Sequence, residues 1–264
     1  MTVMWKSLWQ YRHFILSSIR NELISRFSRS RLGGIWMIIN PLVQVAIYAL
    51  ILSNVLAAKL PGIDNKYAYA IYLTAGTIGW SLFLEIVTRC LTVFIDNGNL
   101  MKKMRFPRIT LPAIVIGSSL LNNGLLIVSA TCAFAIAGHI PNLTLLWLIP
   151  LTLLVVLLAT GVGLLFGIIN VFVRDIGQVV PILLQILFWF TPIVYPATII
   201  PKWLSPYLDL NPMIAIINGY HNVLVYSSAP SMASMLSSFA AALALLSLSL
   251  FLFRKAAPEM VDAL

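Results

Sequence analysis

Charge is the property that this sequence has least of. Only 9% of its 264 residues are Asp, Glu, Lys or Arg, and Asp and Glu together number 8. A soluble domain carries roughly 25% charged residues, whereas this chain is 60% hydrophobic with a mean hydropathy of +0.96. Such a composition excludes an ordinary soluble protein. We expect an all-α polytopic membrane protein that consists of one transmembrane domain, residues 1–264.

Catalytic and metal-binding patterns are also missing. The sequence contains no GxxxxGK[ST] phosphate loop, no CxxC, no HExxH and no DxD pattern, and its three histidines are scattered. The carboxylates are too few and too dispersed for acid/base machinery. The two cysteines lie inside apolar runs, where they are small buried hydrophobes more often than a redox pair. We therefore predict no catalytic residue, metal site or cofactor, and we expect that the chain is not an enzyme.

The basic residues that are present lie mainly on one side of the predicted membrane. Six belong to the N-terminal segment, four to residues 96–108, one is Arg174 and two follow residue 253. Cytoplasmic loops are enriched in Lys and Arg, and basic faces attract anionic membrane lipid. This asymmetry predicts cytoplasmic N- and C-termini, and the net charge of +9 requires no nucleic acid as partner. The opposite side carries only Lys59, Lys66 and Lys202.

Six apolar segments are long enough to cross a bilayer, which takes about 20 residues per helix. Charged loops and turns with Pro or Gly separate them. The N-terminal residues 5–30 place apolar side chains at intervals of three and four, which predicts an amphipathic helix on the membrane surface. With six spans, the two termini lie on the same side. The predicted spans are residues 34–58, 68–95, 109–137, 143–170, 177–196 and 231–253.

The region between the last two spans breaks the pattern of the others. Five prolines fall between residues 192 and 212, and aromatic residues surround them. So many prolines exclude one straight helix, and the region is too apolar for a solvated loop. Irregular backbone at membrane depth is tolerated where protein or a water-filled cavity covers it. We therefore expect residues 197–230 to form re-entrant periplasmic helices; an outer loop with an aromatic belt is the alternative.

Ionisable residues are nearly absent from the spans. Only Glu85 and Arg89 qualify, four residues apart in the second span. They form either a mutually neutralising pair on one helix or a gate or contact to a second protomer. A proton-coupled carrier or pump needs several buried ionisable groups. The energy for any transport is therefore expected to come from another subunit.

Aromatic residues make up 11% of the chain, and several recur on one face of the second span. Such a stripe packs a helix bundle or forms a belt at the membrane interface. Alternatively, it offers sugar rings a track on which to stack. Under this second hypothesis, the residues that line a substrate channel are Tyr69, Tyr72, Trp80, Phe83, Phe188, Trp189, Tyr195, Trp203 and Tyr207.

Five short motifs follow one another along the whole chain. They are RSRLGGIWMIINPL (29–42), NGNLMKKMRFPR (97–108), VFVRDI (171–176), TPIVYP (191–196) and LNPM (210–213). In this order and spacing they resemble the membrane permease of type-2 ABC exporters, in particular the branch that exports O-antigen and related cell-surface polysaccharides. Each motif alone is weak, and none of them identifies the polymer.

This resemblance implies a half-transporter of the bacterial inner (plasma) membrane that forms a homodimer and works with two separate ATPase subunits. ATP and Mg²⁺ would then be bound by those subunits, and the substrate would be a lipid-linked polysaccharide on a polyprenyl pyrophosphate carrier. The resemblance also makes residues 96–108 a cytoplasmic coupling segment. The expected coupling residues are Asn97, Asn99, Lys102, Lys103, Arg105, Arg174 and Asp175.

Three arginines near the end of the surface helix form a possible substrate entrance. We expect Arg26, Arg29 and Arg31 to attract the pyrophosphate, because the guanidinium fork matches phosphate oxygens. Positive-inside anchoring is the alternative explanation for these arginines.

Two other classes of function stay open beside the polysaccharide exporter. One is an ABC permease for another amphiphile, such as teichoic acid, a lipid or a drug. The other is a secondary carrier that works without an ATPase, against which the scarcity of intramembrane charge argues. A membrane glycosyltransferase is disfavoured because no carboxylate pattern for a metal is present.

Overall fold

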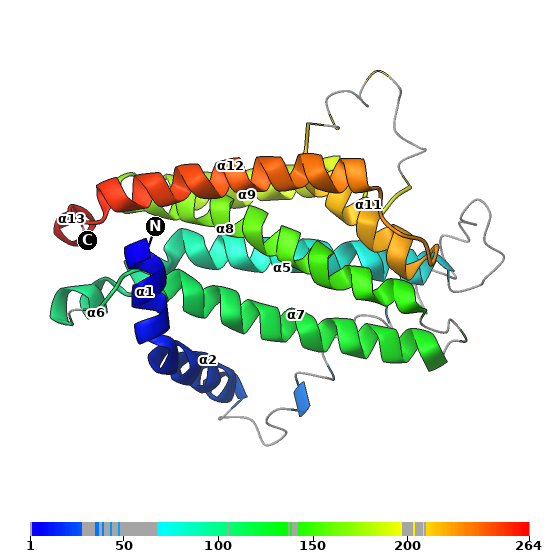
Figure 1. The fold of residues 1–264 in the computed structure, drawn as a ribbon, viewed down its shortest axis with the longest axis horizontal. Helices are drawn as coiled ribbons and strands as arrows, with labels where there is room; N and C mark the ends of the chain where they lie inside the picture. Colours follow the sequence, from blue (N-terminus) through cyan, green and yellow to red (C-terminus); the bar gives the residue numbers. More distant parts are fainter. Residues whose placement is uncertain are drawn as a thin grey trace.

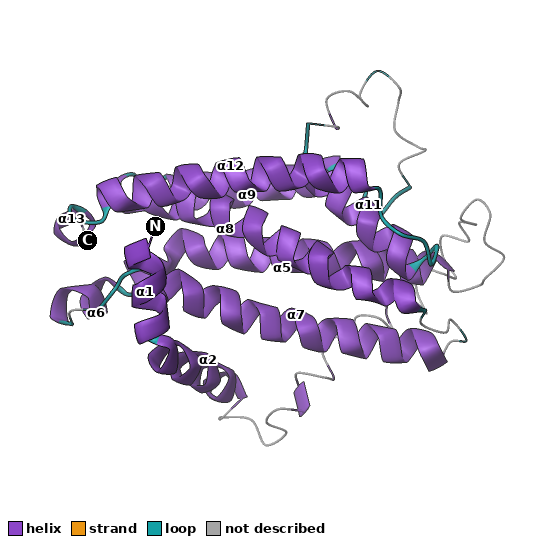
Figure 2. Cartoon of the chain, in the orientation of Figure 1, coloured by secondary structure: helices purple, strands orange, loops and turns teal. Residues whose placement is uncertain are grey.

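The structure, a computed structural model, is a bundle of helices. It describes residues 2–27, 68–104, 106–136, 138, 142–196, 203, 208 and 210–263, with five isolated positions between 35 and 47. These residues form helices and turns without a strand (Figure 2), and the long helices lie side by side (Figure 1). The first predicted span, residues 34–58, lies outside the described residues apart from the isolated positions.

Four predicted spans are confirmed as helices long and apolar enough to cross a membrane. They are α5 (Ala68–Asp96), α7 (Thr110–Ile136), α8 (Leu148–Phe172) and α12 (Met232–Ala256). The 3-10 turn η3 (Leu143–Trp147) precedes α8 and extends it to the predicted start. The chain is therefore a polytopic helical protein, as its composition indicated.

The N-terminal segment consists of two helices instead of the single one predicted. They are α1 (Thr2–Gln10) and α2 (Arg12–Phe27), and Tyr11 forms the turn between them. The predicted apolar stripe faces the bundle, because Ile19 is buried against α7. Gly117 of α7 makes this contact possible, since a side chain there would occupy the place of the Ile19 side chain.

Close helix packing at glycines builds the core around α5 and α8. Gly163 and Gly167 of α8 lie against Cys90 of α5, and a Cβ atom at Gly167 would collide with the Cys90 backbone. On its other side, Gly161 of α8 lies against the backbone of Leu246 in α12. Small residues let membrane helices approach each other closely. The α5–α8–α12 layer is therefore fixed by backbone proximity.

The fifth predicted span, residues 177–196, is six residues too long. The helix α9 (Ile176–Phe190) has 15 residues, which corresponds to about 22 Å and is less than the roughly 30 Å of a bilayer core. The chain leaves the helix at Thr191, whose amide donates to the Phe188 carbonyl at 3.2 Å. Pro192 follows directly and has no N–H group with which to continue the helix.

A second short helix, α11 (Pro212–Leu224), begins inside the bundle. Its proline occupies the first helical turn and Asn211 caps it by accepting from the Met213 amide at 3.0 Å. Ser238 of α12 donates to the Pro212 carbonyl at 3.0 Å. Because Ser238 is the seventh residue of α12, α11 starts about 9 Å along α12 from its beginning. α11 lies within the predicted re-entrant segment 197–230, and the re-entry itself stays a prediction.

Candidate functional site

Cations gather at one end of the bundle, here called the basic end. The short helix α6 (Gly98–Lys103) extends from this end, and both chain termini and the C-terminal helix α13 (Met260–Ala263) lie beside it (Figure 1). The positive-inside prediction places this end in the cytoplasm. Its exposed cations include Lys102, Lys103, Arg174, Arg254 and Lys255.

One face of α6 is anchored and the other is free to receive a partner. Met101 is buried in the core, and the Asn97 side chain donates to the Val93 carbonyl of α5 at 2.8 Å. The two lysines lie in the last turn, where the helix dipole favours cations. Arg105, another predicted coupling residue, lies outside the described residues. The exposed residues of α6 are Asn99, Lys102 and Lys103.

The other predicted coupling residues lie on the turn between α8 and α9. Arg174 and Asp175 are exposed there, and the amide of Ile176 donates to the Val173 carbonyl at 3.2 Å. The helix α13 packs against both α8 and α6, and its Met260 is fully buried. The C-terminal helix thereby connects the two parts of the predicted coupling surface.

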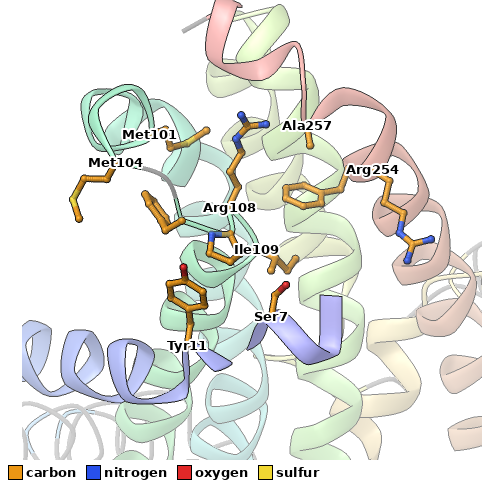
Figure 3. A pocket seen from close by; sticks show the side chains of 11 residues that line it. Ser7, Tyr11, Met101, Met104, Arg108, Ile109, Arg254 and Ala257 are labelled. Carbon is orange, nitrogen blue, oxygen red and sulfur yellow. The ribbon is translucent and has the colours of Figure 1, made fainter. Parts of the chain in front are cut away.

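A cavity of about 590 Å³ opens at the base of α6. In Figure 3, Ser7 and Tyr11 extend from the N-terminal helices toward the segment that carries Arg108. Apolar walls from α6 and α12 complete it, among them Met101 and Phe253. This cavity, called the groove below, therefore offers the Arg108 guanidinium, the hydroxyl groups of Ser7 and Tyr11, and an apolar floor next to the exposed lysines.

Glu85 and Arg89 belong to a network that joins three helices. Arg89 Nη2 lies 2.6 Å from Glu22 Oε1 of α2, and Arg89 Nη1 lies 3.3 Å from Glu85 Oε1 of α5. Arg89 also donates to the hydroxyl of Ser118 at 2.7 Å, while Glu85 accepts from the Asn122 amide at 3.0 Å. The predicted pair exists, but it is not confined to one helix. A contact of this pair to a second protomer stays a prediction.

Sequence reasoning missed Glu22 although a signal was present. Glu22 is the only acidic residue among the first 33. It follows Ile19 by three positions and therefore lies on the same helix face as the buried stripe. An acid on the buried face of a basic surface helix predicts an ion-pair partner within the bundle.

Two tyrosines of the predicted aromatic stripe bind backbone. Tyr69 donates to the Val194 carbonyl at 2.7 Å and Tyr72 donates to the Tyr195 carbonyl at 3.1 Å. The Tyr72 ring also stacks on His221 of α11 at 3.7 Å between centroids. Non-helical backbone inside a membrane protein needs such partners for its carbonyl groups. In this structure the two tyrosines fix the segment that follows α9.

The next part of the stripe packs inside the bundle. The Trp80 ring lies 5.4 Å from Phe83 and 5.6 Å from Phe188, centroid to centroid, and Trp80 is 5% exposed. Side chains enclosed by their own chain are not available to a polymer in this conformation. The exposed members, Trp189 and Trp203, suit the predicted sugar track better. Tyr207 lies outside the described residues, and substrate contact stays a prediction for the whole set.

The helix α9 presents a broad apolar face. Ile182 is 59% exposed and Trp189 is 60% exposed, and only two of its residues are buried. Beside α9 lies an apolar cavity of about 540 Å³, which residues of α8, α11 and α12 also line. A face of this kind meets lipid, a second protomer or an amphiphilic substrate.

The remaining predictions concern the pyrophosphate entrance and metal ligands. The side chains of Arg26, Arg29 and Arg31, the predicted pyrophosphate entrance, lie outside the described residues. Within the described residues, no cluster of His, Cys, Asp and Glu has the size to hold a metal ion. The described residues offer exposed cations at the basic end and exposed apolar faces.

Comparison with known proteins identifies the architecture. The family model described as ABC-2 type transporter matches residues 14–225. The chain belongs to the ABC-2 type transporter family. It is thus a multi-pass membrane component of a transporter, as the motifs along the chain indicated.

Named relatives of this transporter component come from several bacteria. O-antigen export system permease protein RfbA of Myxococcus xanthus is 26% identical over 262 residues, which are 98% of both chains. RfbA of Klebsiella pneumoniae is 29% identical over 205 residues, 77% of each chain. Polysialic acid transport protein KpsM of Escherichia coli is 26% identical over 197 residues, 74% of this chain and 75% of KpsM.

Proposed function

We propose that this chain is the membrane subunit of an ATP-driven exporter that moves lipid-linked O-antigen or a related polysaccharide across a bacterial inner membrane. The observation that carries this proposal is the similarity to the Myxococcus xanthus O-antigen permease over 98% of both chains. The Escherichia coli relative, named for polysialic acid transport, supports polysaccharide as the substrate class. The sequence does not distinguish one polymer from another.

ATP hydrolysis is assigned to a separate subunit, of which the complex contains two copies. The chain has no phosphate loop, and its basic end presents α6, the turn at Arg174 and Asp175, and the 590 Å³ groove on one side of the bundle. An acidic surface of an ATPase would complement the exposed lysines. ATP and Mg²⁺ would be bound by that subunit.

A homodimer would provide the translocation path. The apolar face of α9 suits a second copy of the chain as well as lipid, and α9 is too short to span the bilayer alone. Two copies of α9 that face each other would enclose a path lined by Trp189 and the broken segment after it. Cysteine substitution at Ile182, followed by cross-linking in membranes, tests this arrangement; reaction with lipid-phase reagents only would exclude it.

The pyrophosphate of the lipid carrier is assigned to Arg26, Arg29 and Arg31. In the sequence, all three follow Glu22, through which α2 binds the bundle. Neutralising them together should lower export while membrane insertion and ATPase binding are retained. Unchanged export would leave these arginines with an anchoring role alone.

Deletion of the gene in its native bacterium tests the function directly. We expect lipid-linked polymer to accumulate on the cytoplasmic side and surface polymer to disappear, as measured by fractionation and immunoblot. Deletion of the partner ATPase should give the same phenotype, which a secondary carrier would not show. Normal surface polymer in the deletion strain would exclude the polysaccharide and favour another amphiphile.

The docking surface has a test of its own. Replacing Lys102 and Lys103 with Gln should weaken co-purification of the ATPase, most strongly at low ionic strength, because exposed charges are screened by salt. Lys255→Gln is the matched control, since it removes an exposed cation of the basic end away from α6. If the ATPase co-purifies equally with wild type, the Lys102/Lys103 double variant and Lys255→Gln, a charge-based contact at α6 is excluded.

A further inference from the structure

Arg89 has more partners than neutralisation of Glu85 requires. Its guanidinium lies 2.6 Å from Glu22 of α2, 3.3 Å from Glu85 of its own helix, and 2.7 Å from the Ser118 hydroxyl of α7. It also donates to Ser119 at 3.3 Å. The Arg89 and Glu22 side chains are only 24% and 25% exposed. One cation thus connects the surface helix to two membrane-spanning helices.

A second contact holds α2 in the same place. Ile19 of α2 is 8% exposed and fills the space above Gly117 of α7. Ile19 and Glu22 are three residues apart and therefore share one helix face. The apolar contact sets the position of α2 along α7, and the ion pair sets its rotation. With two attachment points, α2 cannot slide or roll independently of α7.

The network lies between the surface helix and the coupling helix. A cavity of about 310 Å³ is lined by Glu22 and Arg89 on one side and by Asn97 and Leu100 at the start of α6 on the other. This space separates α2 from α6, and α6 packs on α5 and α13, so a displacement of α6 reaches the spans through the last turns of α5 as well as through α13. Arg89 lies two turns before the end of α5. Motion of α5 therefore reaches α2 through Arg89.

Opening the pair is unfavourable at this position. Apart from Arg254 and Lys255 in the last turn of α12, Arg89 is the one cation within the described spans. Separating α2 from α5 would break its 2.6 Å contact with Glu22, and ion-pair contacts of partly buried charges are costly to lose. Movement of α2 together with α5 and α7 keeps all contacts intact, whereas independent movement breaks the shortest one. The network favours motion of the three helices as one body.

We propose that Glu22 and Arg89 form a permanent joint through which the surface helix α2 moves with α5 and α7 when a partner displaces α6. Arg89 is a positioning residue in this role and contacts no substrate. The inference rests on the proposed function, since it takes α6 as the element that the ATPase displaces. It adds that α2 keeps its position on the bundle during each cycle.

The first test is a double-mutant cycle on the intact complex with its ATPase in proteoliposomes. Glu22→Gln and Arg89→Gln should each raise the ATP hydrolysed per molecule exported severalfold, while the ATPase still co-purifies. The double variant should be no worse than the more severe single variant, because both changes remove the same contact. Arg89→Lys should restore part of the coupling, since it keeps the charge. Arg20→Gln, which removes an exposed cation from α2, is the matched control and should behave as wild type.

The outcomes separate this inference from the proposed function. If the wild-type complex exports no polysaccharide with ATP, the proposed function fails first. If wild type exports and the Glu22 and Arg89 variants keep its ATP-to-export ratio, the joint is excluded. Additive effects of the two substitutions would also exclude it, because independent sites add.

The second test needs no substrate. A nitroxide label at the exposed position Ser17 of α2, in a Cys132→Ser background, reports how firmly α2 is attached. Arg89→Gln should increase label mobility, and Arg20→Gln should leave it unchanged. If Arg89→Gln leaves label mobility unchanged, the ion pair does not fix α2 and the proposal is wrong.

Discussion

The helices α5 and α9 are both apolar, yet they have opposite environments. α5 has 19 buried residues among 29, and its neighbours cover nearly every face. α9 has two buried residues among 15, and its large apolar side chains are exposed along its length. Both segments are apolar in sequence, and they differ in how much of their surface is packed against other helices. In this family member, α5 is the structural centre of the described bundle, and α9 presents an exposed apolar face.

Substitutions in α5 and in α9 should therefore affect different properties of the protein. Changes at the contacts of α5 should lower stability, because a packed interior responds to small changes in volume. Changes on α9 should leave stability intact and alter transport or dimer formation. Purified protein in detergent gives the first quantity as a thermal unfolding midpoint, and export assays give the second.

The largest loss of stability is expected at the contact between α5 and α8. Gly167→Ala places a methyl group against the Cys90 backbone, which should destabilise the protein by about 3 kcal/mol because overpacked backbone cannot yield easily. A lower unfolding midpoint or lower yield of monodisperse protein would show it. Gly124→Ala is the control, since nothing lies within 4 Å of a Cβ atom there. Equal midpoints for the two variants would contradict the close approach of the helices.

A smaller loss is expected where α5 binds the segment after α9. Tyr72→Phe keeps the ring that stacks on His221 and removes the hydroxyl that donates to the Tyr195 carbonyl. Stability should fall by about 1–2 kcal/mol, because a partly buried carbonyl loses its donor. Thr88→Val, which removes a hydroxyl that binds only its own helix at 2.7 Å, should have less effect. A midpoint for Tyr72→Phe that equals the wild-type value would contradict the role of this bond.

The smallest effect on stability is expected on α9. Trp189→Ala should change the unfolding free energy by less than about 0.5 kcal/mol because the side chain is exposed. Export should fall roughly tenfold, since loss of one aromatic contact of about 1.4 kcal/mol has that size. Leu236→Ala on α12, also exposed, is the control and should retain export. If Trp189→Ala exports normally, α9 faces lipid and the working surface lies elsewhere.

The sequence predicted the spans well because each depends on local composition. Hydrophobic runs placed α5, α7, the continuous segment η3–α8 and α12 within three residues of their observed ends, and the apolar stripe of the N-terminal segment, which contains Ile19, was found from its spacing. The error at the end of α9 has a simple cause. Residues 191–196 are apolar enough to continue a span, but Pro192 ends the helix and tyrosines from α5 bind the irregular backbone.

The site could be predicted only where it depends on charge. The loop at 96–108 could be predicted as an exposed basic segment because its lysines stand in an otherwise apolar chain. In the structure, Lys102 and Lys103 are exposed. The partners of Arg89 could not be predicted in full, because Ser118 and Ser119 meet it only through tertiary packing. Aromatic spacing did not separate stacking from packing, since Trp80 and an exposed tryptophan look alike in sequence.

The contact of α8 with α12 has a consequence for biosynthesis. α12 follows α8 and α11 in the chain, so the ribosome makes it after them; its Leu246 backbone covers Gly161 of α8, while Ser238 holds the start of α11. Until α12 enters the membrane, the nascent chain therefore presents an unfinished surface on α8 and α11. A translation product that stops before residue 232 lacks the helix that completes the bundle, so quality-control proteases have a clear basis for removing it.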